Sequence, residues 1–163
     1  MSAQFPRIDA NELLLRRVVL ADLPVLYDLQ CDPVSNAMAG TKPRTREVFI
    51  STWDQHFKNP NINGHVIVLQ GGIVGSIACF QAEGCDCVGY WIARAWWGRG
   101  IASHALVKFL QDEPRRPLHA TAARTNAASL RILENCGFRC TGYRMGEATD
   151  RFEQREIAEF LLE

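Results

Sequence analysis

Hydrophobic residues recur every three or four positions in four segments of the chain, and this periodicity predicts four helices. In the second segment Phe49, Trp53 and Phe57 share one helical face. Asp32-Pro33 should end the first helix, and Gly137 should cap the last in the left-handed conformation. The four helices are expected after an Asp22 N-cap, after a Thr45 N-cap, over residues 101–110 and over residues 126–136.

Short runs rich in β-branched and aromatic residues lie between these helices and predict strands. Gly71-Gly72 separates two of the runs, which indicates a hairpin. The strands are expected at residues 13–20, 65–70, 73–80, 87–92, 118–122, 138–143 and 155–162. The element order is β-α-α-β-β-β-α-β-α-β-β, which predicts an α/β (α+β) fold with a mixed sheet in a single domain spanning residues 1–163.

Composition narrows the class of protein. Hydrophobic residues make up 47% of the 163 residues, charged residues 22%, and the formal net charge is zero. This balance favours a globular protein over a general nucleic-acid binder, which needs a basic surface. Residues 1–11 lack the apolar run of a signal peptide, and no apolar stretch approaches the ~20 residues of a membrane span. We therefore expect a cytoplasmic protein that acts without membrane or nucleic acid.

Six cysteines are expected to be reduced thiols rather than disulfides or metal ligands. Cys85 and Cys87 are closer together than the usual zinc-binding pair, and the spacing from Cys136 to Cys140 crosses a predicted helix end. The sequence therefore predicts no metal site. The other two are Cys31 and Cys79.

A glycine-rich turn joins the predicted strand at residues 87–92 to the helix that follows it. Gly98 and Gly100 flank Arg99 just before the helix begins. A helix N-terminus exposes unpaired N–H groups and a partial positive charge, and glycines allow a pyrophosphate to approach them. The turn lacks the third glycine of a dinucleotide fingerprint and the Lys of a P-loop. Taken alone, it is equally consistent with an ordinary strand-to-helix connection.

The helix at residues 126–136 begins with Asn126 and Ser129, which are three residues apart and can point from one face. A capped helix with a surface serine explains this arrangement as well as a ligand site does. The two segments together, however, resemble the two coenzyme-A motifs of the GNAT acetyltransferases. Gly100 and Ala102 occupy the small positions of the first motif, Trp97 replaces its usual Gln or Arg, and the second motif continues to Gly137-Phe138.

This resemblance, strongest over residues 88–138, implies a mostly antiparallel GNAT sheet of about seven strands with about four helices. It is closest to the branch that acetylates ribosomal-protein N-termini and to its aminoglycoside and spermidine relatives. It implies acetyl-CoA as acetyl donor, an amine acceptor such as a peptide N-terminus or a small molecule, and a monomer or homodimer. The cofactor-binding residues that it implies are Tyr90, Trp91, Ile92, Trp97, Gly98, Arg99, Gly100, Ile101, Ala102, Ser103, Asn126 and Ser129.

The resemblance also implies direct attack of a neutral amine on the thioester. Leu133 stands where many members carry a proton-donating tyrosine, so Ser129 is the candidate acid. Cys87 stands where a glutamate is common, and Glu83 in the preceding turn is the candidate base, with Asp86 pointing away from Cys87. Solvated carboxylates explain Glu83 and Asp86 equally well.

A weak base suits an α-amine acceptor, because an α-amine is about one-tenth neutral at pH 7 whereas a lysine amine is neutral in about one molecule in 2,500. Two other functions stay open: a catalytically silent acyl-CoA sensor, and a thiol or metal regulatory module built on Cys85 and Cys87. The resemblance places the acceptor cleft among Trp53, His56, Phe57, Tyr143, Phe152 and Glu153.

Overall fold

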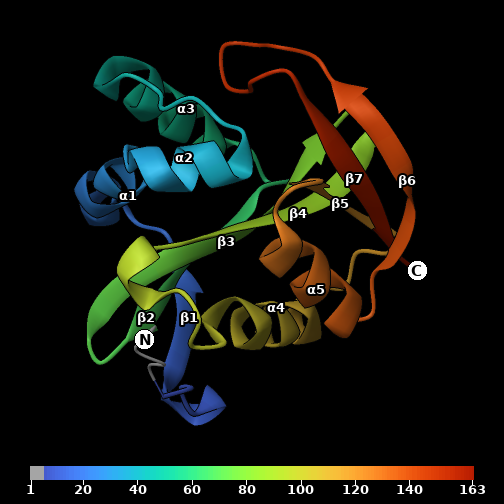
Figure 1. Ribbon diagram of the computed structural model, residues 1–163. Coiled ribbons are helices and arrows are strands. Elements are labelled where there is room, and N and C mark those ends of the chain that lie inside the picture. Colours follow the sequence, from blue (N-terminus) through green and yellow to red (C-terminus); the bar gives the residue numbers. More distant parts are fainter. Residues whose placement is uncertain (1–5) are drawn as a thin grey trace.

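One seven-stranded sheet runs through the computed structural model, which describes residues 6–163 (Figure 1). The strand order is β1-β2-β3-β4-β5-β7-β6, and neighbours are antiparallel except β4 and β5, which are parallel. The strands are β1 Leu13–Arg17, β2 Asn63–Leu69, β3 Gly72–Ala82, β4 Cys85–Ile92, β5 Leu118–Ala123, β6 Arg139–Gly146 and β7 Arg155–Leu162. This mixed, mostly antiparallel sheet is the one that the resemblance implied.

Helices cover both faces of the sheet (Figure 1). Helices α1 to α3 lie on one face over a small core that includes Leu26, Phe49 and Val66. Helices α4 and α5 lie on the other face over the larger core, which includes Leu106 and Phe160. The helices are α1 Leu23–Gln30, α2 Pro33–Ala39, α3 Arg46–Lys58, α4 Ile101–Asp112 and α5 Ala127–Asn135.

The start of the chain differs from the prediction in its turns. The first strand ends at Arg17 instead of residue 20, because the chain turns into a 3₁₀ helix, Leu20–Asp22. Asp22 is the N-cap residue of α1, as expected, but its side chain makes no capping hydrogen bond to that helix; its buried carboxylate accepts from the Val19 N–H at 2.8 Å and pairs with Arg16 at 2.8 Å. The Arg16 guanidinium lowers the pKa of Asp22. Asp22 therefore holds the turn that sends the chain from the sheet into α1.

Helix α2 is an element that the periodicity missed. Helix α1 does end just before Asp32-Pro33, at Gln30, but this pair also starts a new helix, since the Asp32 carboxylate accepts from the Ser35 N–H at 2.9 Å. Proline is well suited to the first helical position because its missing N–H would have no partner there. Helix α2 is only seven residues long and ends at Gly40 in the left-handed conformation. The chain thus has five α-helices in the described residues rather than about four.

The hairpin between β2 and β3 is confirmed, but its turn lies one residue earlier than predicted. Gln70 and Gly71 both have positive φ angles, 52° and 78°, while Gly72 already belongs to β3. Two consecutive positive φ angles match the right-handed twist of the flanking strands.

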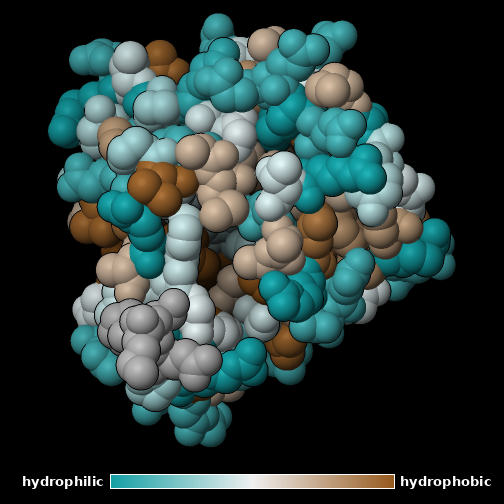
Figure 2. Space-filling view, viewed as in Figure 1, coloured by the Kyte–Doolittle hydropathy of each residue, from teal (hydrophilic) through white to brown (hydrophobic). Residues whose placement is uncertain are grey.

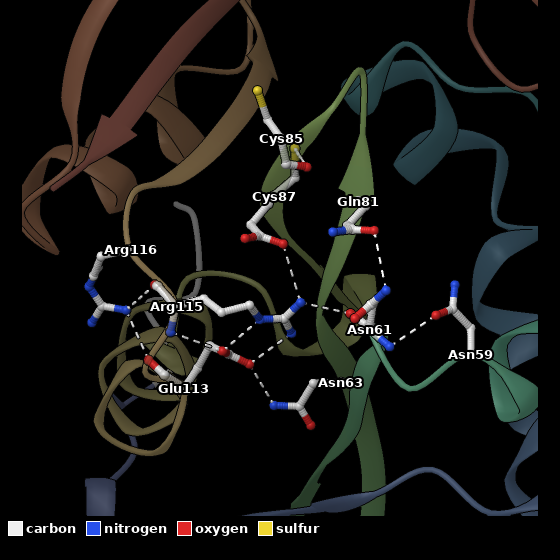
Figure 3. Close-up of polar contacts among 10 residues, drawn as sticks. Asn59, Asn61, Asn63, Gln81, Cys85, Cys87, Glu113, Arg115 and Arg116 are labelled. Atoms are coloured by element: carbon white, nitrogen blue, oxygen red, sulfur yellow. Dashed lines mark hydrogen bonds and ion pairs between the residues drawn. The ribbon is translucent and has the colours of Figure 1, made fainter.

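A polar network fastens the start of β4 to the segment between α4 and β5 (Figure 3). Glu113 is 3% exposed and accepts two hydrogen bonds from the Arg115 guanidinium, at 2.8 and 3.0 Å, and one from Asn63 at 2.9 Å. Arg115 also reaches Asp86 at 3.4 Å and the Asn61 carbonyl at 2.7 Å. Arg115 lowers the pKa of Glu113 to about 2. This network lies where β4 and β5 begin side by side.

The described part of the chain contains no helix that is both long and apolar enough to cross a membrane. The expectation that residues 1–11 are not a signal peptide falls partly on residues 1–5, which lie outside the described residues.

Candidate active site

Strands β4 and β5 separate after one contact. Cys87 pairs with His119, and no later residue of β4 pairs with β5 among the described residues. Strand β5 continues to Ala123 against β7, and β4 continues to Ile92 against β3. The two strands therefore open like a V from the Cys87–His119 contact, and one edge of β4 is left unpaired inside the sheet.

Main-chain groups of Tyr90 and Ile92 face this gap. The Ala93 N–H donates to the Val74 carbonyl at 2.8 Å, which sets the phase of the β3–β4 ladder. Hydrogen-bonded pairs alternate along an antiparallel ladder, so Trp91 directs its main-chain groups to β3 while Tyr90 and Ile92 direct theirs away. The Trp97 indole donates to the Ile92 carbonyl at 2.9 Å. The open edge thus presents amide groups to an extended ligand.

The glycine-rich turn lies at the end of β4 and leads into α4. Gly98 and Gly100 have φ angles of 78° and 82°, and Gly100 is the N-cap of α4. A Cβ at Gly98 would meet nothing within 4 Å, so the space beside the turn is open. The first-turn N–H groups of a helix lack partners within the helix and attract anions. The turn can therefore hold a pyrophosphate on the N–H groups that include those of Ile101, Ala102 and Ser103.

The side chains near the turn are packed against the protein, so the main chain of the turn is what a ligand would contact. Ile101 and Ala102 are buried in the core, so their contribution to a ligand would come from the main chain. The Arg99 guanidinium stacks over the Trp96 ring at 4.4 Å, and its carbonyl accepts from the Ile8 N–H.

A pair of hydroxyl groups lies on the α5 side of the gap. The Tyr90 and Ser129 oxygens are 2.8 Å apart, and the Ser129 N–H donates to the Asn126 side chain at 3.2 Å. Burial raises the pKa of Tyr90 to about 12, so its hydroxyl keeps its proton at neutral pH. Leu133, one turn after Ser129, is 1% exposed and belongs to the core. Position 133 thus offers no hydroxyl, and the tyrosine hydroxyl next to Ser129 is that of Tyr90, from β4.

The resemblance indicated Tyr90 as a cofactor-binding residue but assigned no role to its hydroxyl group. The available signal was strand alternation, since Tyr90 and Trp91 must point to opposite faces of the sheet. Which face would meet α5 could not be read from that pattern. The structure brings together Tyr90, Asn126 and Ser129 beside the glycine-rich turn.

The candidate base is at the other end of β4. Glu83 has a φ of 52° in the β3–β4 turn, is 79% exposed at its side chain and lies 3.7 Å from Arg144. Seven residues of strand separate it from Tyr90, which is about 20 Å. Asp86 is held by Arg115, and burial raises the pKa of Cys87, which favours the neutral thiol. The structure therefore does not bring Glu83, Asp86 or Cys87 to the hydroxyl pair.

A cavity of about 470 Å³ adjoins the end of β5 on the α2 side. Its walls come from α2, the loop before α3, the residues after β5 and the β6–β7 loop, including Asn36, Thr41, Thr125 and Arg155. The Trp91 indole donates at 3.1 Å to the carbonyl of Leu29, two residues before Cys31, which lines the cavity. In the space-filling view the surface is hollowed between the α1–α3 layer and helices α4 and α5 (Figure 2).

The residues that the resemblance placed around an acceptor are divided by the structure. Glu153 lines the 470 Å³ cavity, and Phe152 lies beneath Arg155 next to it. Trp53, His56 and Phe57 line a separate cavity of about 340 Å³ against β1 and β2. Burial lowers the pKa of His56 there. The described residues contain no group of three or more His, Cys, Asp or Glu arranged to hold a metal ion.

Comparison with known proteins decides the family. The family model for the acetyltransferase (GNAT) domain matches residues 12–139, which is most of the chain. The chain belongs to the GNAT acetyltransferase family. Its open strand, glycine-rich turn and hydroxyl-bearing helix are therefore parts of a GNAT acetyltransferase domain. No significant match was found among curated protein sequences.

Solved structures show the same GNAT fold at low sequence identity. Spermidine N-acetyltransferase from Vibrio cholerae, in complex with CoA and spermine, is similar with a TM-score of 0.78 and 16% identity over 93% of this chain and 95% of that chain. RimL, the ribosomal L7/L12 α-N-protein acetyltransferase in complex with coenzyme A, gives 0.76 and 16% over 93% of each chain. Mycobacterium smegmatis RimJ gives 0.74 and 21% over 96% of this chain and 84% of that chain.

Proposed function

We propose that this GNAT protein transfers the acetyl group of acetyl-CoA to an α-amine, either a peptide N-terminus or a small amine. The observation that carries this proposal is the unpaired edge of β4 beside the glycine-rich turn at Gly98 and Gly100. The edge can pair with the amides of a pantetheine arm while the α4 N-terminus receives the pyrophosphate. RimL and the spermidine enzyme, which share the fold, are described with coenzyme A bound.

The N–H groups at the open edge would position the donor. An N–H group directed into the gap from Tyr90 or Ile92 can donate to the thioester oxygen as negative charge develops there. Trp97 restrains the same strand end through the Ile92 carbonyl. The acceptor nitrogen then bonds to the acetyl carbon as the carbon–sulfur bond breaks.

The hydroxyl pair would deliver the proton to the departing sulfur. In this scheme Ser129 donates to the thiolate and takes a proton from Tyr90, whose high pKa keeps it protonated before each turnover. The amine loses one proton during the reaction, so the relay is restored through water. Ser129 thereby acts as the acid expected from the sequence, with Tyr90 as its partner.

The acceptor amine is proposed to be an α-amine because no carboxylate base stands beside the hydroxyl pair. Glu83, Asp86 and Cys87 are held elsewhere, so the amine itself must supply its neutral form. An α-amine does this at neutral pH far more readily than a lysine side chain.

Two measurements on the purified protein test this function. Acetyl-CoA at a hundredfold excess over its dissociation constant should stabilise the fold by about 2.7 kcal/mol, seen as a rise in melting temperature. Coenzyme-A release should follow when α-amine peptides are added, and polyamines and aminoglycosides are the comparison acceptors. No melting shift at millimolar acetyl-CoA contradicts the donor site. A shift without release from any amine identifies an acyl-CoA sensor instead.

A further inference from the structure

Arg155 lines the 470 Å³ cavity, and Arg44 and Arg151 adjoin the segment from Thr41 to Pro43 that forms another part of its wall; none of the three has a carboxylate partner among the described residues. Arg44 comes from the loop before α3, and Arg151 and Arg155 come from the β6–β7 loop and the start of β7. The ion pairs found among the described residues include none of the three. Burial lowers the pKa of each of these arginines, because desolvation disfavours its charged form.

Arg155 forms part of the cavity wall. Its guanidinium lies over the Phe152 ring at 4.5 Å and donates to the Glu153 carbonyl at 3.2 Å, while its Nε is buried without a hydrogen-bond partner. A Cβ on Gly40 would lie 2.0 Å from the Arg155 Cδ, so only glycine leaves room for this side chain. Arg155 is therefore held against the cavity with hydrogen-bonding capacity unused.

Arg151 brings positive charge to the open end of β4. Its guanidinium lies 5.7 Å from the Trp91 ring centre and donates to the Lys42 carbonyl. The positive charge of Arg44 adds to the effect of burial in lowering the pKa of Arg151, which is about 10. Trp91 stands next to the main-chain groups that would hold the thioester. Partly buried positive charges without a counter-ion lower the stability of the fold, and a bound anion would offset this cost.

We propose that the acceptor binds in this cavity and carries an acidic group besides its amine, and that Arg155 binds that group. This inference rests on the proposed acetyl transfer and names its substrate class. Glu153 is the acidic residue in the cavity wall and offers a partner to the amine end of the same molecule. A free amino acid and a peptide with an acidic residue near its N-terminus both carry this chemistry. A polyamine does not.

Matched acceptors test the charge preference. Three amidated tripeptides share an N-terminal alanine and carry glutamate, glutamine or lysine at the second position, so their α-amines are alike. We expect kcat/KM to fall in that order, with the glutamate peptide at least tenfold above the lysine peptide. Free L-glutamate as a fourth acceptor distinguishes an amino-acid substrate from a peptide substrate. Spermidine should be a poor acceptor.

The variant Arg155→Gln tests whether Arg155 is responsible for the preference for the glutamate peptide. It should raise KM for the glutamate peptide roughly tenfold or more and change the glutamine peptide less than twofold. Arg139→Gln, which removes an exposed arginine from β6 on the far edge of the sheet, is the control for net charge and should alter neither value. Unchanged stabilisation by acetyl-CoA in Arg155→Gln shows that the variant is folded.

If turnover is too slow to measure, the charge preference can be tested by acceptor binding. The glutamate peptide should raise the melting temperature of the protein–coenzyme A complex more than the lysine peptide does. Equal shifts, including none, together with equal turnover overturn the inference. So does a preference for the lysine peptide or for spermidine. In either case turnover of any amine still supports acetyl transfer, so the two proposals fail separately.

Discussion

The two ends of β4 differ in how they meet β5. At its start, Cys87 pairs with His119, and the Glu113–Arg115–Asp86 network ties the strand to the chain entering β5 (Figure 3). At its end, Tyr90 and Ile92 face a gap. Two adjacent strands normally stay hydrogen-bonded along their length. Because β4 leaves β5 after one pair, its start must be held firmly in place. The difference teaches that charge pairing holds β4 to its neighbour at one end, while the other end has no strand partner and is the place where we propose that acetyl-CoA binds.

The largest effect should come from breaking the closed end. Glu113→Gln leaves the Arg115 guanidinium partly buried without its carboxylate and should lower the free energy of unfolding by about 3 kcal/mol. For a chain of this size that is a fall in melting temperature of roughly 10 °C. Asp86→Asn, which alters only the 3.4 Å contact, should cost much less. Equal losses in the two variants would contradict the central place given to Glu113.

Acid should remove the same interaction. Arg115 depresses the pKa of Glu113 to about 2, so the carboxylate stabilises the fold above its ordinary pKa near 4.5. That contribution is lost as the pH falls from about 4.5 towards 2. The difference in melting temperature between the parent and Glu113→Gln should therefore shrink when measured from pH 6 down to pH 3. A constant difference across this range would show that Glu113 acts through packing alone.

At the open end, Gly100→Asp should weaken acetyl-CoA binding about a hundredfold. The new carboxylate would lie where the α4 N-terminus attracts a pyrophosphate, and the positive φ of 82° adds strain for a residue with a side chain. Gly100→Asn has the same shape and strain without the charge, and should lose clearly less affinity. Calorimetric titration with acetyl-CoA measures both. If the two variants bind equally, charge repulsion at the turn is not the cause.

Ser129→Ala should lower kcat roughly ten- to a hundredfold with a working acceptor and leave acetyl-CoA affinity nearly unchanged. General acids contribute 10²–10⁴-fold, and a coenzyme-A thiolate leaves readily enough to place this case at the low end. Steady-state kcat and KM decide the matter. An unchanged kcat would leave Ser129 as a cofactor contact at most.

Tyr90→Phe should have the smallest effect, a fall in kcat of about tenfold or less, because Ser129 can still donate its own proton. Since both hydroxyls act in one step, Tyr90→Phe combined with Ser129→Ala should be little slower than Ser129→Ala alone. Fully multiplicative losses in the double variant would mean that the two hydroxyls work independently.

Periodicity predicted most of the fold because most elements bury one continuous face. It missed α2, where the seven residues after Asp32 form a helix too short to show a repeat, and it overextended β1, where the Asp22 side chain turns the chain through its contacts with Val19 and Arg16. The glycine-rich turn at the start of α4 could be predicted because its glycines and helix start are contiguous in sequence. The Tyr90–Ser129 pair could not, since the two residues are 39 positions apart and meet only when α5 packs on the sheet.

The candidate base Glu83 was predicted from closeness in sequence, but it is distant in space. Glu83 is near the Gly89-Tyr90-Trp91 segment in sequence, but a strand extends by about 3.3 Å per residue, so a few positions carry a side chain out of reach. The arginine cluster was likewise hidden, because Arg44 and Arg151 are far apart along the chain and meet across the Lys42–Arg151 contacts.

The strand order places β7 between β5 and β6, in the interior of the sheet. This strand follows all the others along the chain, so it is the last to leave the ribosome. Until it arrives, β5 and β6 each lack the neighbour with which they pair in the finished sheet, and the part of the 470 Å³ cavity wall that Arg155 provides does not exist. The glycine-rich turn and α4 are therefore synthesised well before the cavity wall, which must wait for β7.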